Sequence, residues 1–306
     1  MQPDSQRAVL AALLANVGIA IAKLAAFAFT GAAALLAESA HSIADSGNEA
    51  LLALGSRRAQ KAPTVDHPFG YARERYFWAF VVALVLFSIG SVFAIYEGVS
   101  KLINVHVLDQ PGVAFAVLGV SIVLESLSMR TAVRAARQGR GDRSWWQYIR
   151  TAKTPELPVV LLEDFGALVG LALAAVGIGL NVITGDARYD AAAGVAIGVL
   201  LGVIAAVLAI EMKSLLIGEA ASPEDVAAIR SAIINGTEVD RIIHLRTEHL
   251  GPDDLLVAAK VDLSPAGEHD TPRAIDRVEA RMRARVPHAR VIYLEPDEYR
   301  ADHGDY

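Results

Sequence analysis

Two apolar stretches of the chain carry side chains that together are able to bind a divalent metal ion. Residues 32–54 contain His41 and Asp45, which are one helical turn apart and therefore share one face of a helix. Residues 157–182 contain the adjacent carboxylates Glu163 and Asp164. Neutral imidazole and carboxylate groups suit a transition metal, and three or four around one ion give a tetrahedral, Zn²⁺-like site.

The two adjacent carboxylates are not equivalent in this hypothesis. Neighbouring positions differ by about 100° around a helix, so we expect only one of them to face the metal directly. Asp164 is the first candidate and Glu163 the second, which makes His41, Asp45, Asp164 and Glu163 the candidate ligand set. The alternative is a structural cluster of hydrogen bonds between helices.

The elements that must position these residues are membrane helices. The chain has 306 residues, of which 54% are hydrophobic, and its mean hydropathy is +0.38. Ionisable groups in a membrane segment are costly, so they normally face a cavity and a partner. The apolar segments are each about 20 residues long, enough to cross a bilayer, and predict an α-helical membrane protein with six transmembrane helices. They are residues 8–29, 32–56, 77–102, 112–136, 157–182 and 190–216.

The distribution of basic residues predicts the orientation in the lipid bilayer. Positive charge concentrates in the links after the second and fourth segments, so both termini are expected in the cytoplasm. The first residues lack a signal-peptide cleavage pattern. We therefore expect a multi-pass integral membrane protein, with a bacterial inner membrane as its location. The basic residues are Arg57, Arg58, Lys61, Arg73 and Arg75, then Arg134, Arg137, Arg140, Arg143, Arg150 and Lys153.

After about residue 217 the composition becomes that of a small α+β domain. Ser222 and Pro223 begin a helix, two strands flank the turn 251–253, and a second helix and a third strand follow. This order predicts a ferredoxin-like cytoplasmic domain. We expect a transmembrane domain over residues 1–217 and a dimerisation domain over residues 218–306. Because the domain's core is small, pairing with a second copy would stabilise it, so a homodimer is expected.

Composition and missing motifs exclude several functions. The net charge of −6 argues against a nucleic-acid partner, and the absence of cysteine excludes disulfides and thiolate metal sites. The sequence has no H-E-x-x-H, G-x-S-x-G or Walker motif, so neither an enzyme nor direct ATP drive is expected. A membrane-embedded metalloenzyme stays a competing interpretation, as does a metal sensor or scaffold that does not transport.

Several motifs resemble the cation diffusion facilitator family. They are H-S-x-x-D at residues 41–45, D-H-P-F-G-Y-x-R at residues 66–73, and the acidic fifth segment followed by the α+β domain. The Leu-Glu-Asp run at residues 162–164 is similar to the zinc-transporter-nine-like branch. The resemblance implies a homodimeric exporter that exchanges Zn²⁺ or a similar divalent ion for protons. Many zinc-transporting members have His or Asp where this chain has Val160.

The chemistry of the candidate ligands also suggests a mechanism. If His41 binds the metal, protonation competes with binding, which would couple metal export to proton return. Zn²⁺ is the expected transported ion, although Mn²⁺, Fe²⁺, Co²⁺, Ni²⁺ and Cd²⁺ stay possible, because N and O ligands select weakly among them.

Other polar residues receive secondary predictions. Glu49 lines a cytoplasmic entrance or is solvated, whereas Glu38 lies at an exit or at the membrane interface. Glu125 is hydrogen-bonded inside the bundle, and Asp190 caps its own helix. Asp66 and His67 belong to a structured loop rather than to a minor metal site. Histidines 244, 249, 269, 288 and 303 are solvated, and Lys260 replaces a His that some relatives use for zinc.

Overall fold

The computed structural model describes residues 3–104, 110–265 and 269–300. The chain divides into two compact units. The first comprises Met1–Arg58 and Glu74–Lys213, and the second comprises Ala59–Arg73 and Ser214–Tyr306. His303, one of the predicted solvated histidines, lies outside the described residues.

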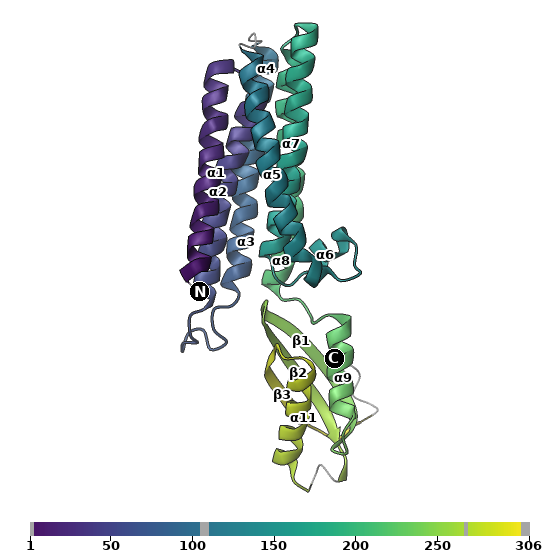
Figure 1. Cartoon of the computed structure of the whole chain (residues 1–306). Helices are drawn as coiled ribbons and strands as arrows, with labels where there is room; N and C mark the ends of the chain where they lie inside the picture. The colour runs from purple at the N-terminus through teal and green to yellow at the C-terminus, as the bar shows by residue number, and fades with distance from the viewer. Residues whose placement is uncertain (1–2, 105–109, 266–268, 301–306) are drawn as a thin grey trace. The chain divides into compact units, whose positions relative to one another are not determined.

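Unit 1 is a bundle of long helices that run roughly along a common direction (Figure 1). The short helix α6 is capped by Ser144, whose side chain accepts from the backbone N of Gln147 in a capping box. The elements are α1 (Pro3–Thr30), α2 (Ala33–Ala59), α3 (Glu74–Val85), the π-helical η1 (Leu86–Val92), α4 (Phe93–Ile103), α5 (Pro111–Arg140), α6 (Trp145–Thr151), α7 (Glu156–Thr184) and α8 (Arg188–Ile217).

Within the described residues, four continuous helical stretches are long and apolar enough to cross a membrane. They are Glu74–Ile103, Pro111–Arg137, Glu156–Thr184 and Arg188–Ile217. The first combines α3, η1 and α4 into one rod of 30 residues. The structure therefore has a helical, membrane-type domain, and four of the predicted spans have the required length and composition. Spans through α1 and α2 stay predictions.

Small residues allow α8 to approach the rod formed by η1 and α4. A Cβ atom at Gly198 would lie 2.7 Å from the side chain of Ile95 and 2.8 Å from its backbone N. A Cβ atom at Gly98 would lie 2.7 Å from the side chain of Val195. The glycines thus permit the two backbones to approach closely. In lipid no hydrophobic force drives helices together, so van der Waals packing at such close approaches helps to hold them.

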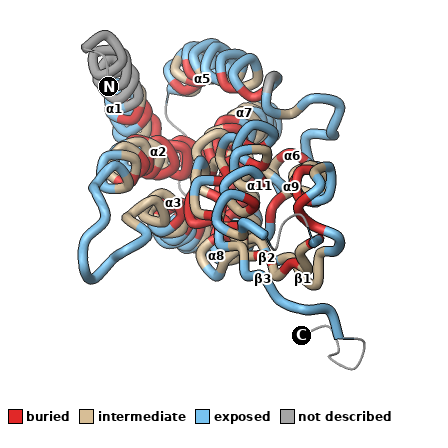
Figure 2. The backbone as a smooth tube through the Cα atoms, turned by 90° about the horizontal axis from the view of Figure 1, so that it is seen from below, coloured by how far each residue is buried: buried red, intermediate tan, exposed pale blue. Residues whose placement is uncertain are grey.

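The N-terminus of α2 is held by α8. Asp190 accepts hydrogen bonds from the backbone N atoms of Ala33, at 2.5 Å, and Ala34, at 3.2 Å. A helix start has unpaired N–H groups and a partial positive charge, which a buried carboxylate satisfies. The prediction that Asp190 caps its own helix is therefore wrong, because the carboxylate caps α2. Viewed along the bundle, buried positions are prominent on α2 and α7 (Figure 2).

Unit 2 contains a three-stranded sheet, with two helices packed on it, in the described part of the chain. The strands β1 (Val239–Gly251), β2 (Asp254–Leu263) and β3 (Ala289–Pro296) lie in the order β1-β2-β3, with β2 antiparallel to β1 and parallel to β3. Helices α9 (Pro223–Ile234) and α11 (Thr271–Arg285) share a core with the sheet. Ser222 caps α9 as predicted, because its side chain accepts from the backbone N of Asp225.

The loop that precedes Glu74 belongs to unit 2 and is ordered by local contacts. Thr64 and His67 exchange two backbone hydrogen bonds, and the rings of His67 and Tyr71 stack with centroids 4.5 Å apart. Arg73 forms an ion pair with Glu248 of β1. The prediction of a structured loop agrees with these contacts.

One predicted solvated histidine of this unit is buried. His249 is 3% exposed, and its ring stacks on that of His288 with centroids 6.1 Å apart. His288 in turn lies 3.3 Å from a carboxylate oxygen of Asp225. The prediction is therefore wrong for His249, because the end of β1 packs its ring inside the domain.

Candidate metal centre

A cavity between α1, α2, α5 and α7 gathers acidic side chains inside unit 1. Its volume is about 40 Å³, and about 10–15 Å³ of such volume holds one water molecule. The space is therefore large enough for a metal ion with an accompanying water. It is lined by Ile19, Ser42, Asp45, Glu49, Glu125, Ser128, Val160, Glu163 and Asp164.

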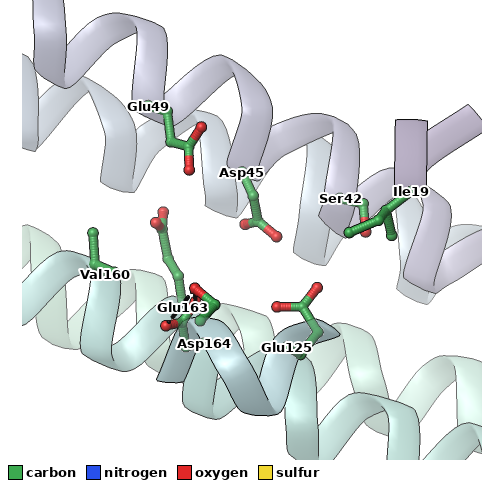
Figure 3. Close-up of a pocket in the computed structure, with 9 residues that line it drawn as sticks. Ile19, Ser42, Asp45, Glu49, Glu125, Val160, Glu163 and Asp164 are labelled. Carbon is green, nitrogen blue, oxygen red and sulfur yellow. Dashed lines mark hydrogen bonds between the residues drawn. The ribbon is translucent and has the colours of Figure 1, made fainter. Parts of the chain in front are cut away.

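The acidic residues face one another across the cavity. Figure 3 shows Asp45 and Glu49 on α2 opposite Glu125 on α5 and Glu163 on α7. Among the described residues, five carboxylates line this single space. Carboxylates repel one another and are poorly solvated inside a helical bundle, so they require a cation or protons for compensation.

Both carboxylates of α7 line the cavity, although they are adjacent in sequence. Glu163 accepts a hydrogen bond from Nδ2 of Asn48 at 2.6 Å. Asp164 accepts a hydrogen bond from Oγ of Ser128, which lies 3.1 Å and 3.0 Å from the two carboxylate oxygens of Asp164. Both carboxylates therefore reach the cavity, and each also meets a neighbouring polar side chain; which of the two would face the metal stays a prediction.

His41 is placed beside the cavity and does not line it. Its side chain is 1% exposed, and Nδ1 lies 3.4 Å from Oδ1 of Asp45. Two ligand atoms bound to one tetrahedral zinc ion at about 2.0–2.1 Å lie roughly 3.3 Å apart, so this separation suits a shared ion. The ring of His41 also lies within reach of the backbone of Glu163 on α7.

The side chains of the candidate ligands do not meet at a single point in this structure. Within the described residues, no three His, Asp or Glu side chains lie close enough together to hold a metal ion as they stand. His41 and Asp45 already have a suitable separation, whereas Glu163 and Asp164 are engaged by Asn48 and Ser128. Metal binding therefore requires side-chain rearrangement within the cavity.

Sequence reasoning gave too little weight to several polar residues of this site. Glu125 and Glu49 line the cavity itself, and Asn48 and Ser128 orient the carboxylates of α7. The signal available in the sequence was a polar residue within an apolar helical segment, which usually faces the interior of a bundle. Glu38 is fully buried, so the prediction that it lies at the membrane interface is wrong.

Comparison with known proteins identifies the family. Residues 9–217 match the model of the cation efflux transmembrane domain. The chain belongs to the cation efflux family. This confirms the resemblance to the cation diffusion facilitators drawn from the motifs around His41 and Asp66.

The relatives of this cation efflux protein also support the zinc-transporter-nine-like branch, which the Leu-Glu-Asp run at residues 162–164 indicated. The chain is 31% identical over 262 residues to metal tolerance protein C4 of Arabidopsis thaliana, covering 85% of this chain and 57% of that protein. It is 30% identical over 258 residues to the mitochondrial proton-coupled zinc antiporter SLC30A9 of Homo sapiens, covering 84% and 45%. A Xenopus laevis protein of the same name is 30% identical over 242 residues, covering 78% and 43%.

The chain spans about half the length of the curated relatives it matches. Membership of the family and the apolar helices together identify an integral membrane protein. Two of these relatives are named as mitochondrial, so the comparisons do not support the expectation of a bacterial inner membrane.

Proposed function

We propose that this protein exports a divalent metal ion, Zn²⁺ first, in exchange for protons. The observation that carries the proposal is the cavity in which carboxylates from α2, α5 and α7 face one another. The relatives named as proton-coupled zinc antiporters support both the ion and the coupling. Cation efflux proteins are transporters, so the family favours transport over a membrane-embedded metalloenzyme.

The proposed binding site uses His41, Asp45, Glu163 and Asp164. His41 and Asp45 already have the separation of two ligands on one ion. Glu163 would complete the site through Oε2, since Asn48 holds only Oε1, and Asp164 would turn within the cavity that it already lines. By alternating access, this site would open to the cytoplasmic side to bind the metal and to the opposite side to release it.

Proton coupling follows from the chemistry of the ligands. A metal ion binds neutral imidazole and ionised carboxylates, so protons and metal compete for the same atoms. Protons that enter from the far side would displace the metal there. They would also neutralise the carboxylates of the empty cavity, which would otherwise repel one another.

The wider architecture belongs to the same proposal. Transmembrane helices α1 and α2 would join the four apolar stretches to give six spans, within a transmembrane domain of residues 1–217. Residues 218–306 would form a ferredoxin-like domain that pairs two copies of the chain. Both termini would lie in the cytoplasm, as the basic links predict.

The test is metal flux in proteoliposomes under an imposed proton gradient. Zn²⁺ flux should respond to the gradient and should be lost in Asp45→Asn and Asp164→Asn. Glu97→Gln is the matched control, since Glu97 is an acid of α4 that pairs with Lys101 at 3.7 Å and lies outside the cavity lining. Parallel assays with Mn²⁺, Fe²⁺, Co²⁺ and Ni²⁺ would rank the ions. Tight Zn²⁺ binding without flux of any ion would overturn the proposal and favour a sensor.

A further inference from the structure

Helix α1 contributes a buried charge that the proposed transport mechanism does not use. Lys23 lies within an apolar stretch of α1, and its side chain is 0% exposed. Its Nζ atom lies 3.1 Å from Oε2 of Glu38 and donates to Oγ of Ser42 at 2.8 Å. Glu38 and Ser42 are one turn apart on α2. The ammonium group is therefore held on one face of α2 by two partners.

This ion pair is costly in its surroundings. Desolvating two charges is expensive, and replacing a buried ion pair with apolar side chains is often neutral or stabilising. The neighbouring helix also accommodates the pair, because a Cβ atom at Gly170 of α7 would collide with Oε1 of Glu38. An ion pair that is expensive, and for which the packing makes room, indicates a role beyond helix association.

The pair borders the candidate metal centre. Ser42, which accepts from Lys23, lines the cavity together with Asp45 and Glu125. The positive charge of Lys23 acts electrostatically on both of these carboxylates. Lys23 is therefore a fixed cation at the edge of a cavity that is otherwise acidic.

We propose that Lys23 sets the metal affinity of the transport site, with Glu38 as the anchor that holds its ammonium group at the edge of the cavity. This inference rests on the proposed function, because it assumes that the cavity binds the transported metal. A fixed positive charge near the site opposes a divalent cation and thereby promotes its release. Glu38 offsets part of this effect and keeps the ammonium group from moving onto Asp45 or Glu125.

The two partners are therefore expected to have opposite effects on metal binding. Lys23→Gln removes the opposing charge, so Zn²⁺ should bind more tightly, on the order of tenfold in Kd. Glu38→Gln releases the ammonium group toward the cavity carboxylates, so Zn²⁺ should bind more weakly by a similar factor. A pair with only a structural role would shift both variants in the same direction, because each leaves one buried charge unpaired.

The experiment is calorimetric titration of the purified full chain with Zn²⁺, alongside transport kinetics in proteoliposomes. Lys23→Gln should lower KM and also lower kcat, since tighter binding slows release. Lys23→Arg retains the positive charge and should therefore keep the wild-type Kd, KM and kcat. Glu97→Gln, an acid outside the cavity, serves as the control for loss of a carboxylate in the bundle.

A double variant tests the proposal if the two single variants fail to fold. Lys23→Met combined with Glu38→Leu replaces the pair by apolar groups and should still bind Zn²⁺ more tightly than wild type, since the ammonium group contacts Ser42 of the cavity lining. Unchanged affinity in this variant, or shifts of the same sign in the two single variants, would overturn the inference alone. If wild type itself does not bind Zn²⁺, the proposed function fails with it.

Discussion

Nδ2 of Asn48 on α2 lies 2.6 Å from Oε1 of Glu163 on α7. This hydrogen bond joins the two helices that supply all the candidate metal ligands. The bond lies at the edge of the acidic cavity and orients the carboxylate of Glu163. The neighbouring carboxylate, that of Asp164, is oriented separately by Ser128 of α5. The site is therefore positioned by neutral polar side chains as well as by the ligands.

Asn48→Ala should weaken both the fold and the site. A hydrogen bond to a carboxylate contributes roughly 1.5–3 kcal/mol, so the thermal midpoint in detergent should fall. Without this donor Glu163 loses its fixed orientation, and the Kd for Zn²⁺ should rise by about three- to tenfold. Isothermal titration measures the second effect.

Asn181→Ala is the matched control for this substitution. Asn181 is also a buried asparagine, on α7, but it does not line the cavity. Equal Zn²⁺ affinities of the Asn48 and Asn181 variants would contradict a role of Asn48 at the site.

Asp190→Ala should destabilise the bundle through α2. The carboxylate caps the backbone N atoms of Ala33 and Ala34, and loss of a helix cap costs about 0.5–2 kcal/mol. Asp190→Asn retains an acceptor and should be milder. Thermal unfolding in detergent provides the measurement, with Asp186→Ala as control, since the side chain of Asp186 accepts only a local bond, from the backbone N of Arg188, in the described contacts. Equal midpoints for the Ala variants of Asp190 and Asp186 would argue against the cap.

Gly198→Ala should separate α8 from α4. The added methyl group would lie 2.7 Å from the side chain of Ile95 and 2.8 Å from its backbone N, and overpacking of this kind costs about 1–3 kcal/mol. Gly119→Ala on α5 is the control, because a Cβ atom there meets no described atom within 4 Å. We expect a lower unfolding midpoint for the first variant and an equal or higher one for the second. A neutral Gly198 variant would show that the helices are not tightly apposed there.

The C-terminal unit should lose stability in acid through Glu238. Burial alone would raise the pKa of this carboxyl, but hydrogen bonds from Arg281 and Arg277, at 3.0 Å and 2.6 Å, outweigh burial and lower its pKa to about 2. A carboxyl with a lowered pKa stabilises the fold above its unfolded pKa, near 4.5. This contribution is lost as the pH falls from about 4.5 to 2.

Hydrogen exchange of the full chain, corrected for the intrinsic effect of pH, tests this contribution in α9, β1 and α11. Glu238→Gln should reduce protection at pH 6 and flatten its dependence on pH below 4.5. Glu224→Gln is the control, because Glu224 is exposed and has no side-chain partner among the described residues. If the two variants had the same acid profile, the Glu238 cluster would not contribute to stability.

Much of the architecture was predictable from the sequence because it depends on local patterns. Long apolar segments predicted the helical membrane-type domain, and the helical spacing of His41 and Asp45 placed them on one face of α2. Ser222 and the turn at residues 251–253 predicted the start of α9 and the hairpin between β1 and β2. These features require only neighbours within one or two turns of chain.

The tertiary structure decided which distant residues meet. The sequence contains Lys23, Glu38 and Asp190, but it does not show that the first two pair between α1 and α2, or that Asp190 caps α2 from α8. It also did not place Glu163 and Asp164 on one cavity, because the 100° between neighbours argued against it. Such contacts depend on how helices rotate and pack against one another. Local periodicity does not specify that rotation, whereas close packing between small residues and buried polar pairs does.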